Sequence, residues 1–359
     1  MNNKSGSKKK KAFKNILKAI LAIICLVLVV RFVGKSINNK TPSGGINESM
    51  YVDINGTKQW INIYGEDANN PVLLYIHGGP FAASSYIDYK SLRKIADVYT
   101  VVTWDQRRSG KTYSKDQSLK DIDMAMMERD GMELTKFLES HLEKDKITLL
   151  GHSWGSYLGA RLALDYPDLY ECYIGTGQFV DYRLDEERFV EAAREWTKND
   201  PAFAKKLADL GDYTKDPDYL EKKTEILTHY GYDMYSDIAK ADYNIYASVF
   251  FNPNYSLIDY VNLYRIIVED FYDDTPLAKH FNTATLWDET TYQIPYYTIQ
   301  GDNDYITNYN SAKEYFDKVY APDKKFYIMK NMGHATFLAR TDEFSNYIHE
   351  IAARQAKEK

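Results

Sequence analysis

A serine inside a short glycine-flanked motif is the first candidate for chemistry. The motif is Gly151-His152-Ser153-Trp154-Gly155. It follows an apolar run, residues 147–150, and precedes a run with helical spacing that ends near residue 166. Strand, Gly-x-Ser-x-Gly and helix in this order form a nucleophile elbow, a tight turn that exposes the serine hydroxyl. We therefore predict that Ser153 is a nucleophile, and the alternative is an ordinary loop between a strand and a helix.

A serine hydroxyl needs a base to accept its proton, and a histidine oriented by a carboxylate can serve as that base. His334 follows the last predicted strand, residues 325–329. Asp302 and Asp304 follow the strand before it, residues 294–300, and either could orient the imidazole. The order serine, acid, histidine along the chain is the order found in hydrolases that carry this elbow.

Backbone N–H groups are expected to stabilise the oxyanion that forms when a serine attacks a carbonyl. The N–H of Trp154 lies at the start of the helix that follows the elbow. The loop His77-Gly78-Gly79-Pro80 follows the apolar strand at residues 72–76. We assign the second donor to the N–H of Gly79, because two adjacent glycines let the backbone approach a substrate closely.

Several polar residues near these motifs are expected to be structural. His77 should hold its own loop, and His152 should pack beneath the elbow. Asp105, Arg107 and Arg108 could brace loops through buried ion pairs or could contact substrate. We favour the structural interpretation for this cluster.

These residues need a scaffold that brings the ends of several strands together. Short apolar runs alternate with helical patterns, which predicts an α/β fold with a mostly parallel sheet and helices on both faces. The candidate residues all come directly after predicted strands, at the sheet edge where ligands bind in such folds. The strands are predicted at 51–54 and 58–64 (a hairpin), 72–76, 98–104, 147–150, 171–176, 294–300 and 325–329, and the main helices at 124–142, 311–319 and 342–356.

The pattern changes between residues 181 and 290. Helices rich in tyrosine, phenylalanine and charge replace the strands, and they are predicted at 187–196, 202–210, 219–230 and 255–271. We predict a helical cap over residues 181–290, inserted between two parts of the core at 51–180 and 291–359.

The N-terminal segment carries a charge opposite to that of the rest of the chain. Residues 1–40 hold nine lysines, one arginine and no acid, and therefore carry +10. The whole chain of 359 residues carries −6, so the remainder carries −16. A folded part this acidic argues against nucleic acid as a partner.

A membrane explains the basic segment better. The apolar run at residues 16–33 would span about 27 Å as a helix, close to the thickness of the hydrocarbon core. We predict an uncleaved transmembrane signal anchor over residues 1–34. A cleaved signal peptide lacks a small-x-small site after the run, and a lipoprotein signal at Cys25 would have a bulky isoleucine before the cysteine. The basic flank should stay in the cytoplasm, which places the rest of the chain outside the cell membrane.

The segment after the anchor, residues 35–50, is rich in Asn, Ser, Gly and Pro and is expected to be a flexible linker. Cys25 and Cys172 are expected to stay unpaired, and no spacing of Cys or His indicates a metal site. The predicted chemistry needs no cofactor.

Together, the motifs resemble those of the proline iminopeptidase (prolyl aminopeptidase) branch of the α/β-hydrolases. The resemblance covers about residues 51–180 and 290–345. It implies a triad of Ser153, His334 and Asp304, with Asp304 preferred over Asp302. It also implies a helical cap and the release of an N-terminal residue, often proline, from small peptides. The matching motifs are His77-Gly78-Gly79-Pro80, Trp104-Asp105-Gln106-Arg107, Gly151-His152-Ser153-Trp154-Gly155-Ser156, Gly301-x-x-Asp304 and Gly333-His334.

Two residues depart from the family pattern. Phe81 replaces the glycine that follows His-Gly-Gly-Pro, and Arg108 replaces the glycine that follows Asp-Gln-Arg. Both are expected to narrow the mouth of the site or to change its charge, and Phe81 is a candidate substrate contact. The family binds the free amine of its substrate through cap glutamates. The candidates here are Glu187, Glu191, Glu195 and Glu269.

The sequence therefore predicts a membrane-anchored serine hydrolase of the aminopeptidase type, with a small peptide or acyl substrate. One alternative keeps the triad and hydrolyses apolar acyl esters, as carboxylesterases and lipases do, which an aromatic cap would suit. The other alternative is a non-catalytic ligand-binding protein on the same fold. A hydrolase with an aspartate nucleophile is disfavoured, because Ser153 occupies the elbow.

Overall fold

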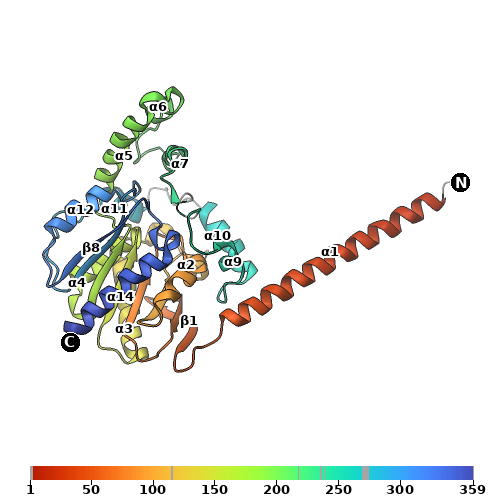
Figure 1. Cartoon of the computed structure of the whole chain (residues 1–359), viewed down its shortest axis with the longest axis horizontal. Helices are drawn as coiled ribbons and strands as arrows, with labels where there is room; N and C mark the ends of the chain where they lie inside the picture. Colours follow the sequence, from red (N-terminus) through yellow and green to blue (C-terminus); the bar gives the residue numbers. More distant parts are fainter. Residues whose placement is uncertain are drawn as a thin grey trace.

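A sheet of eight strands organises the chain (Figure 1). The structure is a computed structural model that describes residues 3–114, 116–216, 218–234, 237, 239–268 and 275–358, without the side chains of residues 3–10, 262, 264–268 and 358. The strand order is β1-β2-β4-β3-β5-β6-β7-β8; β2 is antiparallel to β1 and β4, and all other neighbours are parallel. The strands are β1 Ile46–Ile54, β2 Thr57–Gly65, β3 Val72–Ile76, β4 Thr100–Asp105, β5 Ile147–His152, β6 Tyr170–Thr176, β7 Tyr296–Gly301 and β8 Lys324–Met329.

Helices cover both faces of the sheet, which explains the apolar runs in the sequence. Every residue of β3, β4, β5 and β7 is buried, as expected for parallel strands between two helical layers. Leu74 and Ile76 of β3 face a core completed by α3, α4 and α12, whereas Leu73 and Tyr75 face one completed by α2, α13 and α14. These helices are α2 Ser85–Leu92, α3 Met124–Leu142, α4 Trp154–Asp165, α12 Tyr309–Lys318, α13 Thr336–Ala339 and α14 Thr341–Glu358.

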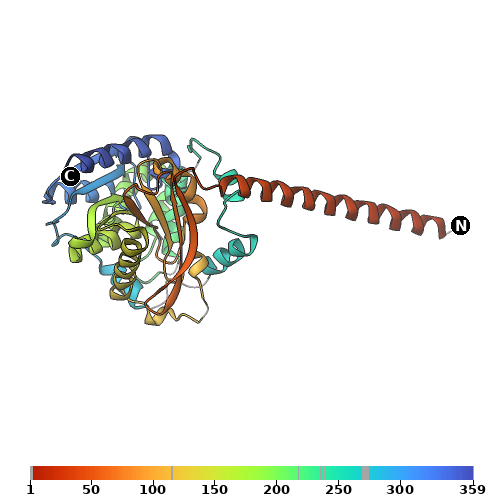
Figure 2. The same ribbon diagram turned by 90° about the horizontal axis from the view of Figure 1, so that it is seen from below.

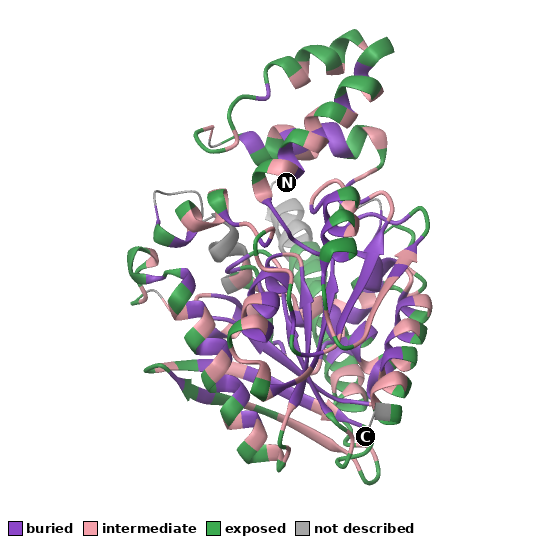
Figure 3. Ribbon diagram, turned by 90° about the vertical axis from the view of Figure 1, so that its left-hand side faces the viewer, coloured by how far each residue is buried: buried purple, intermediate pink, exposed green. Residues whose placement is uncertain are grey.

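The described elements between β6 and β7 are helices, apart from an isolated bridge between Asp181 and Thr285. We call this segment the cap, and α5 and α7 pack there around an apolar cluster of their own. Figure 3 shows exposed residues along the outer cap helices and buried residues concentrated in the sheet. Residues 269–271 of one predicted helix lie outside the described residues. The cap helices are α5 Tyr182–Trp196, α6 Pro201–Ala208, α7 Tyr219–Tyr230, α9 Ile245–Phe250, α10 Leu257–Val268 and α11 Pro276–Thr283.

A long helix, α1 (Asn3–Asn38), projects from the body (Figures 1 and 2). Its segment Lys11–Asn38 is long and apolar enough to cross a membrane. The structure differs from the flexible linker predicted at residues 35–50, because α1 continues to Asn38 and β1 already begins at Ile46. The last turns of α1 are held by hydrogen bonds to the cap, so only residues 39–45 connect the helix to the sheet.

Candidate active site

Ser153 occupies the turn between β5 and α4 in a strained backbone conformation. Its φ is 56° and its ψ is −124°, in a region that residues with a side chain rarely adopt. The Ser153 N–H donates to the carbonyl of Thr176 (3.0 Å), and the Ser153 carbonyl accepts from the N–H of Ser156 (2.8 Å). The turn is therefore fixed on both sides, as a nucleophile elbow requires.

The two glycines of the elbow are needed because the backbones touch. A Cβ on Gly155 would lie 2.1 Å from the carbonyl oxygen of Ile76, and a Cβ on Gly151 would lie 2.3 Å from that of Gly155. Helix α4 can therefore start directly against β3. This close approach places Ser153 at the carboxyl end of the sheet, where the neighbouring strands also end.

Asp304 and His334 form a buried pair. The Nδ1 atom of His334 lies 2.9 Å from Oδ2 of Asp304, and the two residues are 5% and 1% exposed. Oδ2 of Asp304 also accepts from Gln300 and from the hydroxyl of Thr307, while Oδ1 accepts from the N–H groups of Ile306 and Thr307. Both carboxylate oxygens are thus satisfied, and the orientation of Asp304 towards the imidazole is fixed.

The competing carboxylate, Asp302, is turned away from His334. Its Oδ1 accepts from the N–H of Asn331 (2.6 Å), and its Oδ2 lies 3.3 Å from Nζ of Lys330. Of the two aspartates that the sequence left open, only Asp304 contacts the imidazole in this structure.

His334 stands beside the elbow. Its ring centroid lies 4.8 Å from that of His152, and its carbonyl is 3.1 Å from Nε2 of His152. No hydrogen bond joins the described residues Ser153 and His334, and in enzymes without bound substrate such bonds are often long or poorly aligned. Burial, followed by the neighbouring His334, lowers the pKa of His152 to about 3. His152 is therefore a neutral residue packed beneath the turn, in the position predicted for it.

The loop after β3 lies against the elbow. A Cβ on Gly78 would lie 3.0 Å from Cβ of Ser153, and Gly79 has a φ of 86° that favours glycine. His77 holds this loop through contacts with the carbonyl of Gly78 (2.7 Å) and the hydroxyl of Ser109 (3.1 Å). Burial lowers its pKa to about 4, so His77 is neutral.

Gln106 joins the two segments that carry the predicted oxyanion donors. Its Nε2 donates to the carbonyl of His77 (3.0 Å), and its Oε1 accepts from Nε1 of Trp154 (3.2 Å). Trp154 is the first residue of α4, so its N–H has no acceptor within the helix. The loop after β3 and the start of α4 are therefore fixed relative to each other.

The charged residues after β4 are braces, but they do not form one network. The guanidinium of Arg107 makes a two-point contact with the carboxylate of Asp130, at 2.7 and 2.8 Å, and both side chains are buried. Asp105 accepts from the N–H of Lys111 (2.8 Å) and from the hydroxyl of Tyr255. The structural interpretation of this cluster fits these contacts.

Phe81 and Arg108, the two departures from the family pattern, share a backbone feature. Their φ angles are 69° and 63°, left-handed values that cost a residue with a Cβ about 1–2 kcal/mol. Nη1 of Arg108 donates to the carbonyls of Ser114 (3.2 Å) and Gln117 (2.7 Å), and the effect of its charge on the site mouth stays a prediction. Phe81 is 6% exposed and packs in the apolar core, where it does not line the cavity described next. Its role as a substrate contact stays a prediction.

A cavity of about 280 Å³ lies between the cap and the loop after β3. It touches the loop after β3 at Gly79, the neighbour of Gly78, and Ser153 itself is not in its lining. Apolar walls come from the cap and from the loop after β7. Its lining includes Gly79, Glu186, Asp216, Lys223, Phe281 and Ile306.

The sequence missed the glutamate that faces this cavity. Glu186 is buried, 2.6 Å from Nζ of Lys223, and accepts from the hydroxyl of Tyr219 (2.6 Å). A signal was present in the sequence, because Glu186 lies on the helical face that also carries Phe189 and Ala193. Three of the glutamates chosen from the sequence do not line this cavity: Glu187 is exposed and pairs with Arg183, Glu195 is exposed and pairs with Lys198, and Glu191 is exposed. Glu269 lies outside the described residues.

A second missed residue, Asp237, connects the cap to the histidine loop. Its carboxylate accepts from the N–H of Gly333 (3.0 Å) and from the N–H of Ala335 (3.1 Å), the two residues that flank His334. Burial raises the pKa of Asp237, and the two N–H donors oppose that effect. No local pattern marks this residue, because its partners lie almost a hundred positions away.

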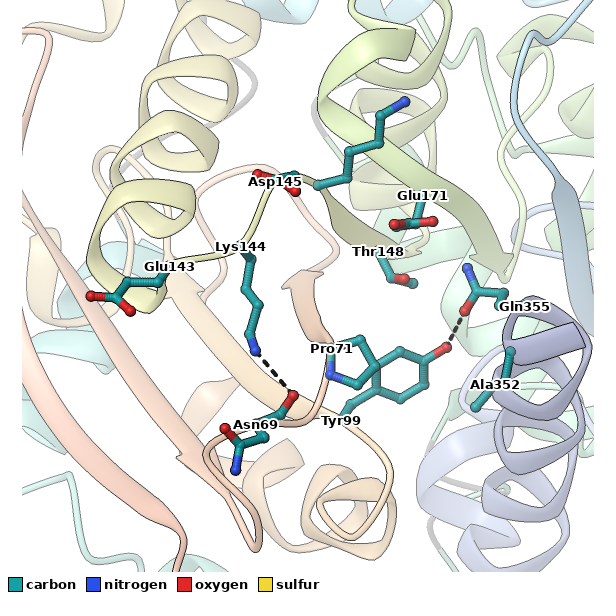
Figure 4. A pocket seen from close by; sticks show the side chains of 12 residues that line it. Asn69, Pro71, Tyr99, Glu143, Lys144, Asp145, Thr148, Glu171, Ala352 and Gln355 are labelled. Atoms are coloured by element: carbon teal, nitrogen blue, oxygen red, sulfur yellow. Dashed lines mark hydrogen bonds between the residues drawn. The ribbon is translucent and has the colours of Figure 1, made fainter. Parts of the chain in front are cut away.

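A larger hollow, about 380 Å³, lies at the opposite end of the sheet (Figure 4). Its lining includes Pro71 and Tyr99, which directly precede β3 and β4, together with Thr148 of β5 and Gln355 of α14. The hydroxyl of Tyr99 donates to Gln355 there (Figure 4). This hollow is at the amino ends of the strands, away from Ser153, and is therefore not the candidate active site.

Comparisons with known proteins agree with this geometry. The family model for the α/β hydrolase fold matches residues 71–341. A protein of Bacillus subtilis strain 168 named probable aminopeptidase YbaC is 26% identical over 309 residues, which cover 84% of this chain and 95% of that protein.

Two solved structures show the same fold. The proline iminopeptidase of Mycobacterium smegmatis has a TM-score of 0.59 at 18% identity, and the match covers 86% of this chain and 98% of that one. A membrane phospholipase A described as a bacterial virulence factor has a TM-score of 0.56 at 17% identity, over 97% of this chain and 99% of that one.

Proposed function

The chain belongs to the α/β-hydrolase family, and from this premise we propose that it is a membrane-anchored serine hydrolase that releases N-terminal residues from small peptides. The observation that carries the proposal is the buried Asp304–His334 pair beside the strained elbow of Ser153. The similarity to a Bacillus subtilis protein named probable aminopeptidase supports the choice of substrate class.

In this mechanism Ser153 attacks the carbonyl of the substrate, and Nε2 of His334 accepts the hydroxyl proton. Asp304 holds the Nδ1 side of the imidazole and stabilises its charged form. The N–H groups of Gly79 and Trp154 donate to the oxyanion. His334 then passes its proton to the leaving amine, and a water molecule activated by His334 releases the acyl group from Ser153.

Glu186 is the candidate acceptor for the substrate's ammonium group, because it is the buried carboxylate in the cavity that begins at Gly79. A free amine bound there would share the carboxylate with Lys223. Glu187, Glu191 and Glu195 are less suited, since they are exposed and outside the cavity lining.

A second candidate function, hydrolysis of acyl esters, is favoured by the charge balance of the cavity. Its two carboxylates, Glu186 and Asp216, already carry Lys223 and Lys222 as partners at 2.6 Å. Such a neutralised cavity with apolar walls suits an uncharged acyl chain. The fold similarity to a membrane phospholipase A extends over nearly the whole chain and fits this alternative.

The test is a substrate panel with the full-length enzyme in detergent micelles. Aminoacyl arylamides, including proline, are compared with their N-blocked forms and with short p-nitrophenyl esters. Cleavage that requires the free amine supports the aminopeptidase, and ester cleavage indifferent to an amine supports the second candidate. No cleavage of any substrate would contradict both.

Matched variants test the residues. Ser153→Ala should reduce turnover by roughly 10⁴–10⁶-fold. Asp304→Asn should reduce it by about 10⁴-fold, whereas Asp302→Asn, which changes the rejected aspartate, should leave it near wild type. Similar losses in the two aspartate variants would contradict the assigned triad.

We also propose that α1 is an uncleaved anchor with the catalytic domain outside the cell membrane. The contacts of Arg31 and Lys35 with the cap support this proposal, because a cleaved leader would not be built into the folded domain. N-terminal sequencing of the protein from carbonate-washed membranes tests it, and a mature N-terminus beyond residue 33 would contradict it.

A further inference from the structure

The C-terminal end of α1 is built into the cap. The guanidinium of Arg31 is 6% exposed and donates to the carbonyls of Phe250 and Tyr255, the latter at 3.0 Å. Nζ of Lys35 donates to the same carbonyl of Tyr255 (2.6 Å). A Cβ on Gly34 would lie 2.2 Å from the ring of Phe251, so helix and cap touch directly. The direction of α1 relative to the domain is therefore fixed.

These contacts leave no spacer between the domain and a bilayer around α1. Arg31 lies only two residues before the end of the apolar run at residue 33, a distance of about 3 Å along a helix. If residues 16–33 span the hydrocarbon core, the segment that receives Arg31 must lie at the level of the lipid headgroups. That segment joins α9 to α10, and both helices lie on the side of the body from which α1 leaves (Figures 1 and 2).

Helix α10 presents an apolar face outward at this level. Leu257, Ile258 and Val261 are 54%, 62% and 47% exposed, and their spacing of one, three and four residues places them on one helical face. The hydroxyl of Tyr260, on the other side of the helix, donates to the carbonyl of Val249 and so faces the protein. Among the large hydrophobic side chains exposed in the described chain outside α1, these three are the only ones that share a helix.

Side chains typical of a membrane interface lie close to the start of α10. Tyr51 is 50% exposed, and its hydroxyl donates to the carbonyl of Lys111 (3.3 Å). Nζ of Lys111 donates to the carbonyl of Asn254, next to α10, and lies 3.5 Å from the ring centre of Trp60. Tyrosine, tryptophan and lysine concentrate where proteins meet lipid headgroups.

We propose that the α10 apolar face (Leu257, Ile258 and Val261) is a bilayer-docking surface, which inserts into the interface beside α1 and holds the catalytic domain in one orientation on the membrane. This inference rests on the proposed anchor and goes beyond it, because a spanning helix does not by itself bring any part of the cap into contact with lipid. A bilayer is the occupant that the structure favours, since the apolar run of α1 ends against the segment that directly precedes α10.

Collision accessibility of nitroxide labels on the full-length chain in phosphatidylcholine–phosphatidylglycerol vesicles tests the proposal. Labels are attached to Ile258→Cys and, as the matched control, to Tyr320→Cys. Both variants also carry Cys25→Ala, which removes the exposed native cysteine, whereas Cys172 is buried and can remain. Tyr320 is 74% exposed and distant in sequence from the cap and from α1. Molecular oxygen concentrates in lipid, and a nickel chelate stays in water, so the ratio of their effects reports depth.

We expect a label at 258 to be more accessible to oxygen than to nickel, and a label at 320 to be accessible to both. Equal, water-like accessibility at the two positions would refute the docking surface. Low accessibility to both reagents at 258, together with spin–spin broadening, would refute the docking surface and indicate that a second copy of this chain covers the α10 apolar face. Flotation of the labelled protein with the vesicles is measured in parallel: failure to float refutes the anchor, and the docking surface with it, whereas flotation with a water-exposed 258 refutes the docking surface alone.

Discussion

Removing Lys223 should leave a buried charge without its partner. Glu186 and Lys223 have side chains that are 3% and 3% exposed and lie 2.6 Å apart. Lys223→Met keeps the length of the side chain but removes its charge, and the carboxylate of Glu186 then has only the hydroxyl of Tyr219 as a donor. Breaking one side of such a pair costs about 3–5 kcal/mol of unfolding free energy.

The double variant Glu186→Gln/Lys223→Met separates the cost of an orphaned charge from the value of the pair. Neutral groups of similar size often replace a buried ion pair with little loss of stability. The double variant should therefore recover most of the stability lost in Lys223→Met. Urea unfolding in micelles, followed by tryptophan fluorescence, reports this because Trp196 lies in the same cap, 6.3 Å from Phe189.

The neighbouring lysine supplies the control. Lys222 pairs with Asp216 at 2.6 Å, but its side chain is 38% exposed. Lys222→Met should cost no more than about 1 kcal/mol. Equal losses in Lys222→Met and Lys223→Met, or a double variant as unstable as Lys223→Met, would refute the reasoning. If Glu186 binds the substrate's amine, Lys223→Met should also lower the KM for free-amine substrates but leave that for N-blocked esters unchanged.

Three further outcomes are expected. Asp237→Ala removes the acceptor of the two N–H groups beside His334 and should lower kcat by on the order of 10–100-fold with little change in KM; steady-state kinetics check this, and a change in KM alone would contradict it. Arg108→Gly should be about 1–2 kcal/mol more stable to urea than Arg108→Ala, because the left-handed φ penalises any Cβ, and the reverse order would show that the backbone is not strained there. Burial raises the pKa of Asp88 from 3.8 to about 7. The neutral form of Asp88 therefore makes its full contribution to stability below pH 3.8, and this contribution is lost as the pH rises through 7. Asp88→Asn should therefore gain up to about 4 kcal/mol relative to wild type between about pH 4 and pH 8, and a constant difference in urea midpoints would contradict this.

The elements closest to the predictions are those whose signals are local. Helix α3 occupies the predicted residues 124–142, because Asp123 caps its start through the N–H of Met126 and Glu143 ends it with a φ of 52°. Strand β3 occupies the predicted residues 72–76, because a short, fully apolar run is bounded there by turn residues. Strand β1 was missed over its first residues, since Ile46 to Met50 is mostly polar and only pairing with β2 makes it a strand.

The residues that sequence reasoning missed depend on distant partners. Glu186 needs Lys223, 37 positions away, and Asp237 needs the loop around His334. Phe81 and Arg108 were recognised as departures, but their left-handed backbone became visible only in the structure. Both residues keep the left-handed conformation that a glycine adopts without strain.

Tyr255 connects α1 to the end of β4 beside the candidate active site. Its carbonyl receives Arg31 and Lys35, and its hydroxyl donates to Asp105, the residue before Gln106. Cutting the chain after residue 40 would remove both cationic donors at one end of this connection. If α1 is the membrane anchor proposed above, proteolytic release of the domain is therefore expected to reduce its activity.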